Sequence, residues 1–152
     1  MNKNALLLER FKRLPFGLWL VTRAICWKAP YFSTIRPSII RLEPGFGVIK
    51  IKKRRAVLNH LGTVHAIAMA NLCELVAGVT LEMTLPDTHR WIPKSMKINY
   101  LAKATSDVRG KVAIVLGPLP DAGSLVVHVD VVDDKEIAVV TADIEMYVSK
   151  RK

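Results

Sequence analysis

Apolar and polar positions follow two different periods along this chain, and the changes of period mark its expected elements. Residues 64–83 are apolar on nearly all sides, which predicts a buried helix rather than a surface one. The segments on either side alternate with a period of two, which predicts strands with one buried face. The expected strands are 37–42, 47–53, 91–103, 109–116, 125–132 and 136–148. We expect two strands, a long helix, and then a meander of four strands.

Two helical segments are expected before the first strand. Residues 4–13 form an amphipathic pattern, and residues 18–28 continue as a second helix that Pro30 ends. The apolar side of the first helix consists of Leu6, Leu7 and Phe11. Both helices are expected to pack on the sheet as a lid. An interfacial membrane helix is the alternative, because Trp19, Trp27 and several basic residues are present.

Length and composition are those of one globular domain. The chain has 152 residues, 51% of them hydrophobic, which is enough for a substantial core. Cys26 and Cys73 are isolated, and Cys73 within the apolar helix is expected to be a buried free thiol. Nothing in the sequence resembles a disulfide framework or a zinc site, so a reducing cytoplasm is the expected location.

Positive charge is concentrated in the first third of the chain. Residues 1–55 carry 13 Lys and Arg against two acids, a net charge of +11, and the whole chain carries +10. This bias favours an anionic partner such as nucleotide phosphates or a membrane surface, with peripheral contact through residues 1–30. Few aromatic residues lie among the basic ones in the strands, so no nucleic-acid partner is expected.

A polar cluster precedes the apolar helix, and one carboxylate interrupts it. Asn59, Gly62 and His65 come directly before the helix, and Glu74 is the only charge between residues 64 and 81. A charge in a buried helix is costly unless it is paired or used in chemistry. The pattern therefore makes Glu74 the strongest candidate for an acid/base residue.

The spacing of Asn59, Gly62, His65, Glu74 and Gly78 resembles the signature of hotdog-fold acyl-CoA thioesterases of the phenylacetyl-CoA type. The chain departs from that signature at Ala66 and Ile67, where the family has two glycines. The resemblance implies an α+β hotdog fold, in which a curled antiparallel sheet wraps a long central helix, here with extra N-terminal helices. It implies a helical extension over 1–33, a hotdog domain over 34–152, and a homodimer or tetramer with its sites at the dimer interface.

The resemblance also implies roles in thioester hydrolysis. Glu74 would act as general base or nucleophile. Asn59 would hold the water or the carbonyl, unless its amide only satisfies a turn. The N–H of Ala66 at the helix start would polarise the thioester oxygen, and His65 would fix the loop or donate to the same oxygen.

The remaining expectations concern the substrate. Gly62, Arg54, Arg55 and Lys103 are expected to bind it, with the basic residues at the phosphates of coenzyme A. No metal or separate cofactor is expected, since coenzyme A, or an acyl-carrier protein in its place, is part of the substrate.

Two alternatives stay open at this point. His60 lies fourteen residues before Glu74, the spacing of hotdog 3-hydroxyacyl dehydratases, in which a His and an acid move protons on the acyl chain. The other alternative is a non-catalytic module that binds acyl groups or docks on a membrane.

Overall fold

The computed structural model describes residues 2–151, which form three long helices and six strands. The helices are α1 (Lys3–Lys12), α2 (Gly17–Lys28) and α3 (Ala66–Thr84), with short 3-10 turns η1 (Pro30–Ile35) and η2 (Arg55–Val57). The strands are β1 (Ser38–Glu43), β2 (Phe46–Ile51), β3 (His89–Tyr100), β4 (Val108–Ala113), β5 (Ala122–Val132) and β6 (Ala138–Lys150).

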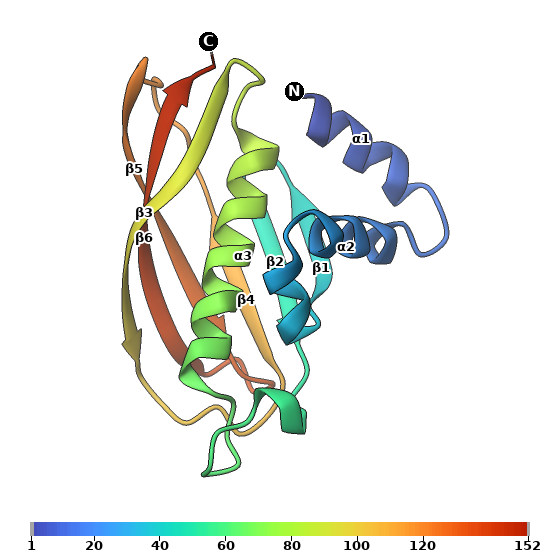
Figure 1. The fold of residues 1–152 in the computed structure, drawn as a ribbon, viewed down its shortest axis with the longest axis vertical. Coiled ribbons are helices and arrows are strands. Elements are labelled where there is room, and N and C mark those ends of the chain that lie inside the picture. Colours follow the sequence, from blue (N-terminus) through green and yellow to red (C-terminus); the bar gives the residue numbers. More distant parts are fainter. Residues whose placement is uncertain (1, 152) are drawn as a thin grey trace.

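The strands form one antiparallel sheet that curls around α3, as Figure 1 shows. The strand order is β1-β2-β4-β5-β6-β3, and every pairing is antiparallel. The predicted single buried face is confirmed for the last two strands, because Val129, Val131, Val140 and Met146, at alternating positions, have no exposed surface. The expected α+β hotdog architecture is confirmed.

The predicted meander of four strands is wrong for its first member. β3 pairs with β6 from His89↔Lys150 to Tyr100↔Val140, whereas β4 pairs with β2 and β5. The reason is the helix: α3 crosses the concave face of the sheet and delivers the chain to the edge beside β6. Residues 101–107 then lead back to β4 in the middle of the sheet. β3 is therefore an edge strand, and residues predicted for one apolar face, such as Met96 and Tyr100, are 37% and 47% exposed.

α3 is the centre of the core. Leu72, Cys73, Val76 and Ala77 have no exposed surface, and the helix packs closely on β2, where a side chain at Gly47 would collide with Thr80. By length and composition α3 could cross a membrane, but most of it is buried inside this fold. Its apolar character is that of a core helix.

α1 and α2 lie on the opposite side of α3 from β3, β5 and β6, and α2 packs on β1 (Figure 1). The expected packing on the sheet is confirmed for α2, which contacts β1 and whose Val21 and Ile25 reach the core; α1 instead packs mainly on α2 and α3 through the buried Leu8. Of the predicted inner face of α1, Phe11 is half-buried, while Leu6 and Leu7 are about half exposed; the residues that are fully buried are Ala5 and Leu8. Two aromatic side chains of α2 do not pack either: Trp19 is 61% exposed and Trp27 86%.

Candidate functional site

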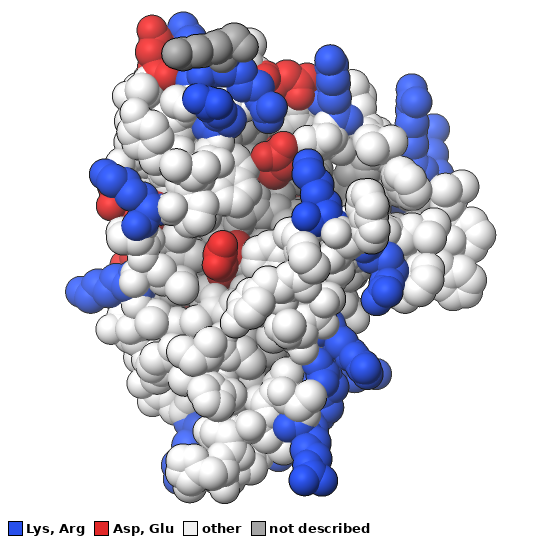
Figure 2. Space-filling view, in the orientation of Figure 1, with Lys and Arg blue, Asp and Glu red and all other residues white. Residues whose placement is uncertain are grey.

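An apolar pocket of about 650 Å³ lies between α3, the two N-terminal helices and the start of β3. Figure 2, in the orientation of Figure 1, shows a largely uncharged hollow on this side of the molecule, with acidic side chains inside it and basic ones around it. The walls are mostly aliphatic and aromatic, which is typical of a site for a small ligand with an apolar body. They include Leu7, Phe11, Val21, Ile25, Phe32, Leu75, Val79, Met83 and Trp91.

Glu74 lies in the wall of this pocket. It is half-buried, and it shares one face of α3 with Leu75, Gly78, Val79 and Glu82, which all line the same space. Within residues 2–151, no hydrogen bond or ion pair engages its carboxylate, whereas that of Glu82 on the same helix has several partners. An unpaired carboxylate beside apolar walls is free to accept a proton from a bound molecule.

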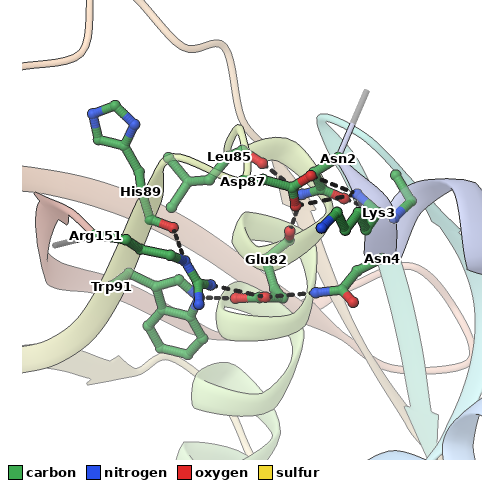
Figure 3. A network of polar contacts seen from close by, with 10 residues as sticks. Asn2, Lys3, Asn4, Glu82, Leu85, Asp87, His89, Trp91 and Arg151 are labelled. Carbon is green, nitrogen blue, oxygen red and sulfur yellow. Dashed lines mark hydrogen bonds and ion pairs between the residues drawn. The ribbon is translucent and has the colours of Figure 1, made fainter.

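Glu82, about two helical turns further along α3, is bound on several sides (Figure 3). Its carboxylate accepts hydrogen bonds from Asn4 Nδ2 at 2.7 Å and from Trp91 Nε1 at 2.8 Å, and Arg151 Nη2 lies 3.9 Å away. This carboxylate therefore joins α1, β3 and the end of the chain to α3. Glu82 and its partners Trp91 and Arg151 line the pocket at the end where α3 ends.

Asn2 fixes the first turn of α1 against the last turn of α3. Its Oδ1 accepts from the N–H of Ala5 at 2.7 Å and caps α1, while its Nδ2 donates to the carbonyls of Glu82 and Leu85 at 2.5 Å each. Asp87 accepts from the N–H of Lys3 at 3.1 Å. α1 is thus held as a wall of the pocket at the end shown in Figure 3.

Gly78 gives the indole of Trp91 access to the helix surface. A Cβ at position 78 would lie 2.6 Å from the Trp91 ring, closer than packed atoms allow. Gly78 and Trp91 therefore define the pocket wall between Glu74 and Glu82. This is a packing reason for glycine at a position of the expected signature.

The loop that precedes α3 uses its polar side chains internally. Asn59 Oδ1 accepts from the N–H groups of Leu61 at 3.0 Å and Thr63 at 3.1 Å, and Asn59 Nδ2 donates to Thr63 Oγ1 at 2.9 Å. These contacts form an Asx-type turn, with Gly62 at φ 72°. In this chain, the amide of Asn59 is occupied by the turn.

His65 caps the N-terminus of α3. Its Nδ1 accepts from the N–H of Ile67 at 3.0 Å, since its extended backbone places the ring over the first turn. Ala66 is the first residue of the helix, where N–H groups have no partner within the helix. The hydroxyl of Tyr100 donates to the Ala66 carbonyl at 3.3 Å.

The basic candidates gather at the same end of the molecule as this loop. The N–H of Val64 donates to the carbonyl of Ala104, and that of His65 donates to the carbonyl of Val57. These bonds bring the segments that carry Arg54, Arg55 and Lys103 beside the start of α3. Arg54 Nη2 donates to the Thr34 carbonyl at 2.6 Å, whereas Arg55 and Lys103 are exposed and have no ion pair within residues 2–151.

Within one chain, the structure does not join the two halves of the predicted site. Glu74 follows Ala66 by eight residues of helix, about 12 Å along the axis. Asn59, His65 and Ala66 are not among the residues that line the pocket. His60 is exposed on the loop and is also absent from the pocket, so no contact supports a His60–Glu74 pair within one chain.

Asn71 is a polar residue near Glu74 to which the sequence analysis gave no role. It is only 7% exposed, its Nδ2 lies 3.4 Å from Thr34 Oγ1, and its Oδ1 has no hydrogen-bond partner among the described residues. It precedes Glu74 by three residues, so the two project from neighbouring positions of one helix face. Its place within an uncharged run was the only signal in the sequence.

Other reactive groups are poorly placed for chemistry. The expected buried thiol is confirmed: Cys73 is fully buried, and burial raises the pKa of its thiol to about 12. Among residues 2–151, no three metal-ligating side chains cluster. The carboxylate of Glu74 remains the chemical group that the pocket offers.

Solved structures resemble this chain over almost its full length. The crystal structure of genomics protein APC5556 has 39% sequence identity and a TM-score of 0.84, covering 97% of this chain and 98% of that one. A thioesterase from Haemophilus influenzae, HI1161, has 14% identity and a TM-score of 0.75, with 91% and 94% covered. A mutant of thioesterase enzyme SAV0944 from Staphylococcus aureus has 18% identity and a TM-score of 0.69, with 79% and 98% covered.

The two thioesterases share the hotdog fold with this chain. Their low sequence identity supports a common fold and nothing about activity. No curated protein matches the sequence. The family described as "Domain of unknown function (DUF4442)" matches residues 17–148, from the start of α2 to within two residues of the end of β6. This chain therefore belongs to the DUF4442 family, whose domain here has a hotdog fold like that of thioesterases.

Proposed function

We propose that this protein hydrolyses acyl thioesters, with the acyl chain in the pocket behind α3 and Glu74 as the catalytic carboxylate. One observation carries the proposal: a carboxylate without a partner among the described residues lies in the wall of an apolar pocket of about 650 Å³. Such a pocket accommodates an acyl chain, and a free carboxylate activates water beside it. The fold shared with thioesterases supports the same reaction class.

In the general-base form of the reaction, Glu74 takes a proton from water while the water oxygen attacks the thioester carbon. The tetrahedral intermediate collapses as the carbon–sulfur bond breaks, and the proton passes from Glu74 to the leaving thiolate. The products are a free acid and a thiol.

The oxyanion donor in this proposal comes from a second copy of the chain. β3 is a long edge strand whose Ile92, Met96 and Tyr100 are 61%, 37% and 47% exposed. A long exposed edge is a template for another strand, so we infer a homodimer that pairs along β3. The partner subunit's Ala66 would then supply the N–H that binds the thioester oxygen. Within one chain, Ala66 and Glu74 are about 12 Å apart along the helix.

Coenzyme A is the proposed carrier. Its phosphates would lie at the exposed Arg55 and Lys103, at the end of the molecule where α3 begins, and the acyl chain would extend the opposite way toward Glu82. Arg54 is the weaker phosphate ligand, because its guanidinium already binds the Thr34 carbonyl.

A panel of acyl-CoA esters, with the free thiol measured as product, tests the proposal. We expect hydrolysis of esters with medium or long acyl chains, and a loss of about 10²-fold to 10⁴-fold in turnover for Glu74→Gln, the range for a general base. Glu43→Gln is the matched control, because its carboxylate lies on β1 outside the pocket. Equal turnover of wild type and Glu74→Gln would refute the role of Glu74.

A further inference from the structure

The outer face of α2 exposes aromatic side chains that the fold does not use. We call Phe16, Trp19, Arg23 and Trp27 the α2 outer face. Phe16 is 83% exposed, Trp19 61% and Trp27 86%, whereas other residues of the same helix pack inward. Trp19, Arg23 and Trp27 are four residues apart, so they form one continuous row along the helix.

The turn between α1 and α2 holds Phe16 in a costly conformation. Its φ is 60°, in the left-handed region, which is unfavourable for a bulky residue. The next residue, Gly17, has no room for a side chain, because a Cβ would lie 1.7 Å from the Phe11 carbonyl oxygen. This tight turn points the Phe16 ring into solvent, next to the row on α2.

The surroundings of the α2 outer face are positively charged. Arg13, Arg23 and Lys28 are exposed, and none of them has an ion pair within residues 2–151. Glu9 is the only acid between residues 2 and 37, and it is paired with Lys12 at 2.6 Å. The partner that complements this surface is both apolar and negatively charged.

We propose that the α2 outer face docks on an anionic phospholipid membrane. Trp and Phe rings beside Arg and Lys are the composition that binds the boundary between lipid headgroups and acyl chains. A second copy of this face fits poorly, because an isologous contact would bring positive charges together. The hydrogen bonds of Asn2 and Glu82 hold α1, and the α1–α2 turn is tight, so the face is ordered before binding.

Co-sedimentation of the full chain with phospholipid vesicles tests this docking. We expect binding to vesicles of equal parts phosphatidylcholine and phosphatidylglycerol, weak binding to phosphatidylcholine alone, and binding that falls as salt rises. Trp27→Ser should weaken binding by about tenfold or more through lost apolar contact. Arg23→Gln should weaken it by about fivefold, the effect of one basic residue near such a surface.

Two exposed residues elsewhere serve as matched controls. Val126→Ser on β5 and Lys135→Gln in the β5–β6 turn remove the same kinds of group far along the chain from α2, and neither should change binding. Since all four variants change exposed side chains, each should fold, which its unfolding temperature would verify. The docking does not depend on hydrolysis, so it can fail or hold independently of the proposed activity.

Three results would overturn the proposal. The first is no binding of wild type to the phosphatidylglycerol vesicles at low salt. The second is equal loss in the control variants and in Trp27→Ser, which would indicate unspecific attraction. The third is a wild-type protein that does not bind vesicles, together with a Trp27→Ser variant that dissociates into smaller oligomers. That result would make the α2 outer face a contact between copies of the chain.

Discussion

Two glutamates on the same face of α3 line one pocket and differ in every contact. Glu82 accepts hydrogen bonds from Asn4 and Trp91 and lies beside Arg151, while Glu74, about 12 Å lower on the helix, binds no residue that the structure describes. The first connects three elements and the second connects none. A carboxylate engaged with several protein donors stabilises the fold, and one left free near apolar walls is available for substrate chemistry.

Removing the carboxylate of Glu82 should have the largest effect on stability. Glu82→Ala leaves Trp91 Nε1 and Asn4 without their acceptor, so we expect a loss of about 1–3 kcal/mol in the free energy of unfolding. Turnover measured below the melting temperature should stay close to that of wild type, because Glu82 takes no proton in the proposed reaction.

Urea unfolding of Glu82→Ala and of the control Glu136→Ala measures this difference. Glu136 is 54% exposed and paired with Arg109 and Lys111 at the surface, so its removal should cost clearly less stability than that of Glu82. Equal losses in the two variants would mean that Glu82 is no more structural than a surface charge.

Filling the pocket should change substrate preference without touching either glutamate. Val79 lines the pocket between them, and Val79→Phe would occupy space that a long acyl chain needs. We expect kcat/KM for long chains to fall by about tenfold, as for a small steric misfit, while short chains react as before. The control Val126→Phe lies on the exposed face of β5. A uniform loss for all chain lengths would place the acyl chain elsewhere.

Asn59 offers a test of the loop. Asn59→Ala removes the acceptor of the Leu61 and Thr63 N–H groups and should cost about 1 kcal/mol of stability. Asn59→Asp keeps that acceptor and should retain most of the stability. A turnover that collapses in Asn59→Ala while stability is unchanged would instead show that the amide acts on the substrate.

His128, on β5, should give the smallest effect, and one that depends on pH. Its hydrogen bond to Asp143 at 2.7 Å raises the pKa of the imidazole above 6.5. Because the pKa of His128 is higher in the folded than in the unfolded protein, the pair stabilises the fold fully below pH 6.5. This stabilisation is lost as pH rises through the pKa of the folded state.

His128→Gln should therefore lower the free energy of unfolding near pH 5.5 by less than about 0.5 kcal/mol, because the His128–Asp143 pair is half exposed. Near pH 8.5 the substitution should leave stability unchanged. Thermal unfolding at both pH values measures this. A larger loss at the higher pH would contradict the sign.

The periods of the sequence predicted most of the fold for physical reasons. A helix that is apolar all round must be surrounded, and alternating strands must cover it, so α3 and the inward faces of β5 and β6 could be inferred. The position of β3 could not, because strand pairing depends on where the preceding helix crosses the sheet. The exposure of Trp19 and Trp27 was likewise hidden, since composition does not reveal which helix face is covered.

The candidate site was predictable only where a residue broke a pattern. Glu74 is the lone charge in an apolar run, and that signal identified it. The role of Glu82 depends on Asn4 and Trp91, which are distant in sequence, and the pocket exists only because α1 docks on α3. Roles in hydrolysis for Asn59, His65 and Ala66 stay predictions, with the first two occupied in the loop and cap of one chain.

The most direct test compares Glu74→Gln and Glu82→Gln on the same long-chain acyl-CoA, with turnover and unfolding free energy measured for each. Turnover should fall by about 10²-fold or more in Glu74→Gln, with stability within about 0.5 kcal/mol of wild type. Glu82→Gln should show the reverse, a less stable protein with nearly full turnover. Wild-type turnover in Glu74→Gln, or loss of turnover in Glu82→Gln alone, would contradict the division of roles between the two glutamates.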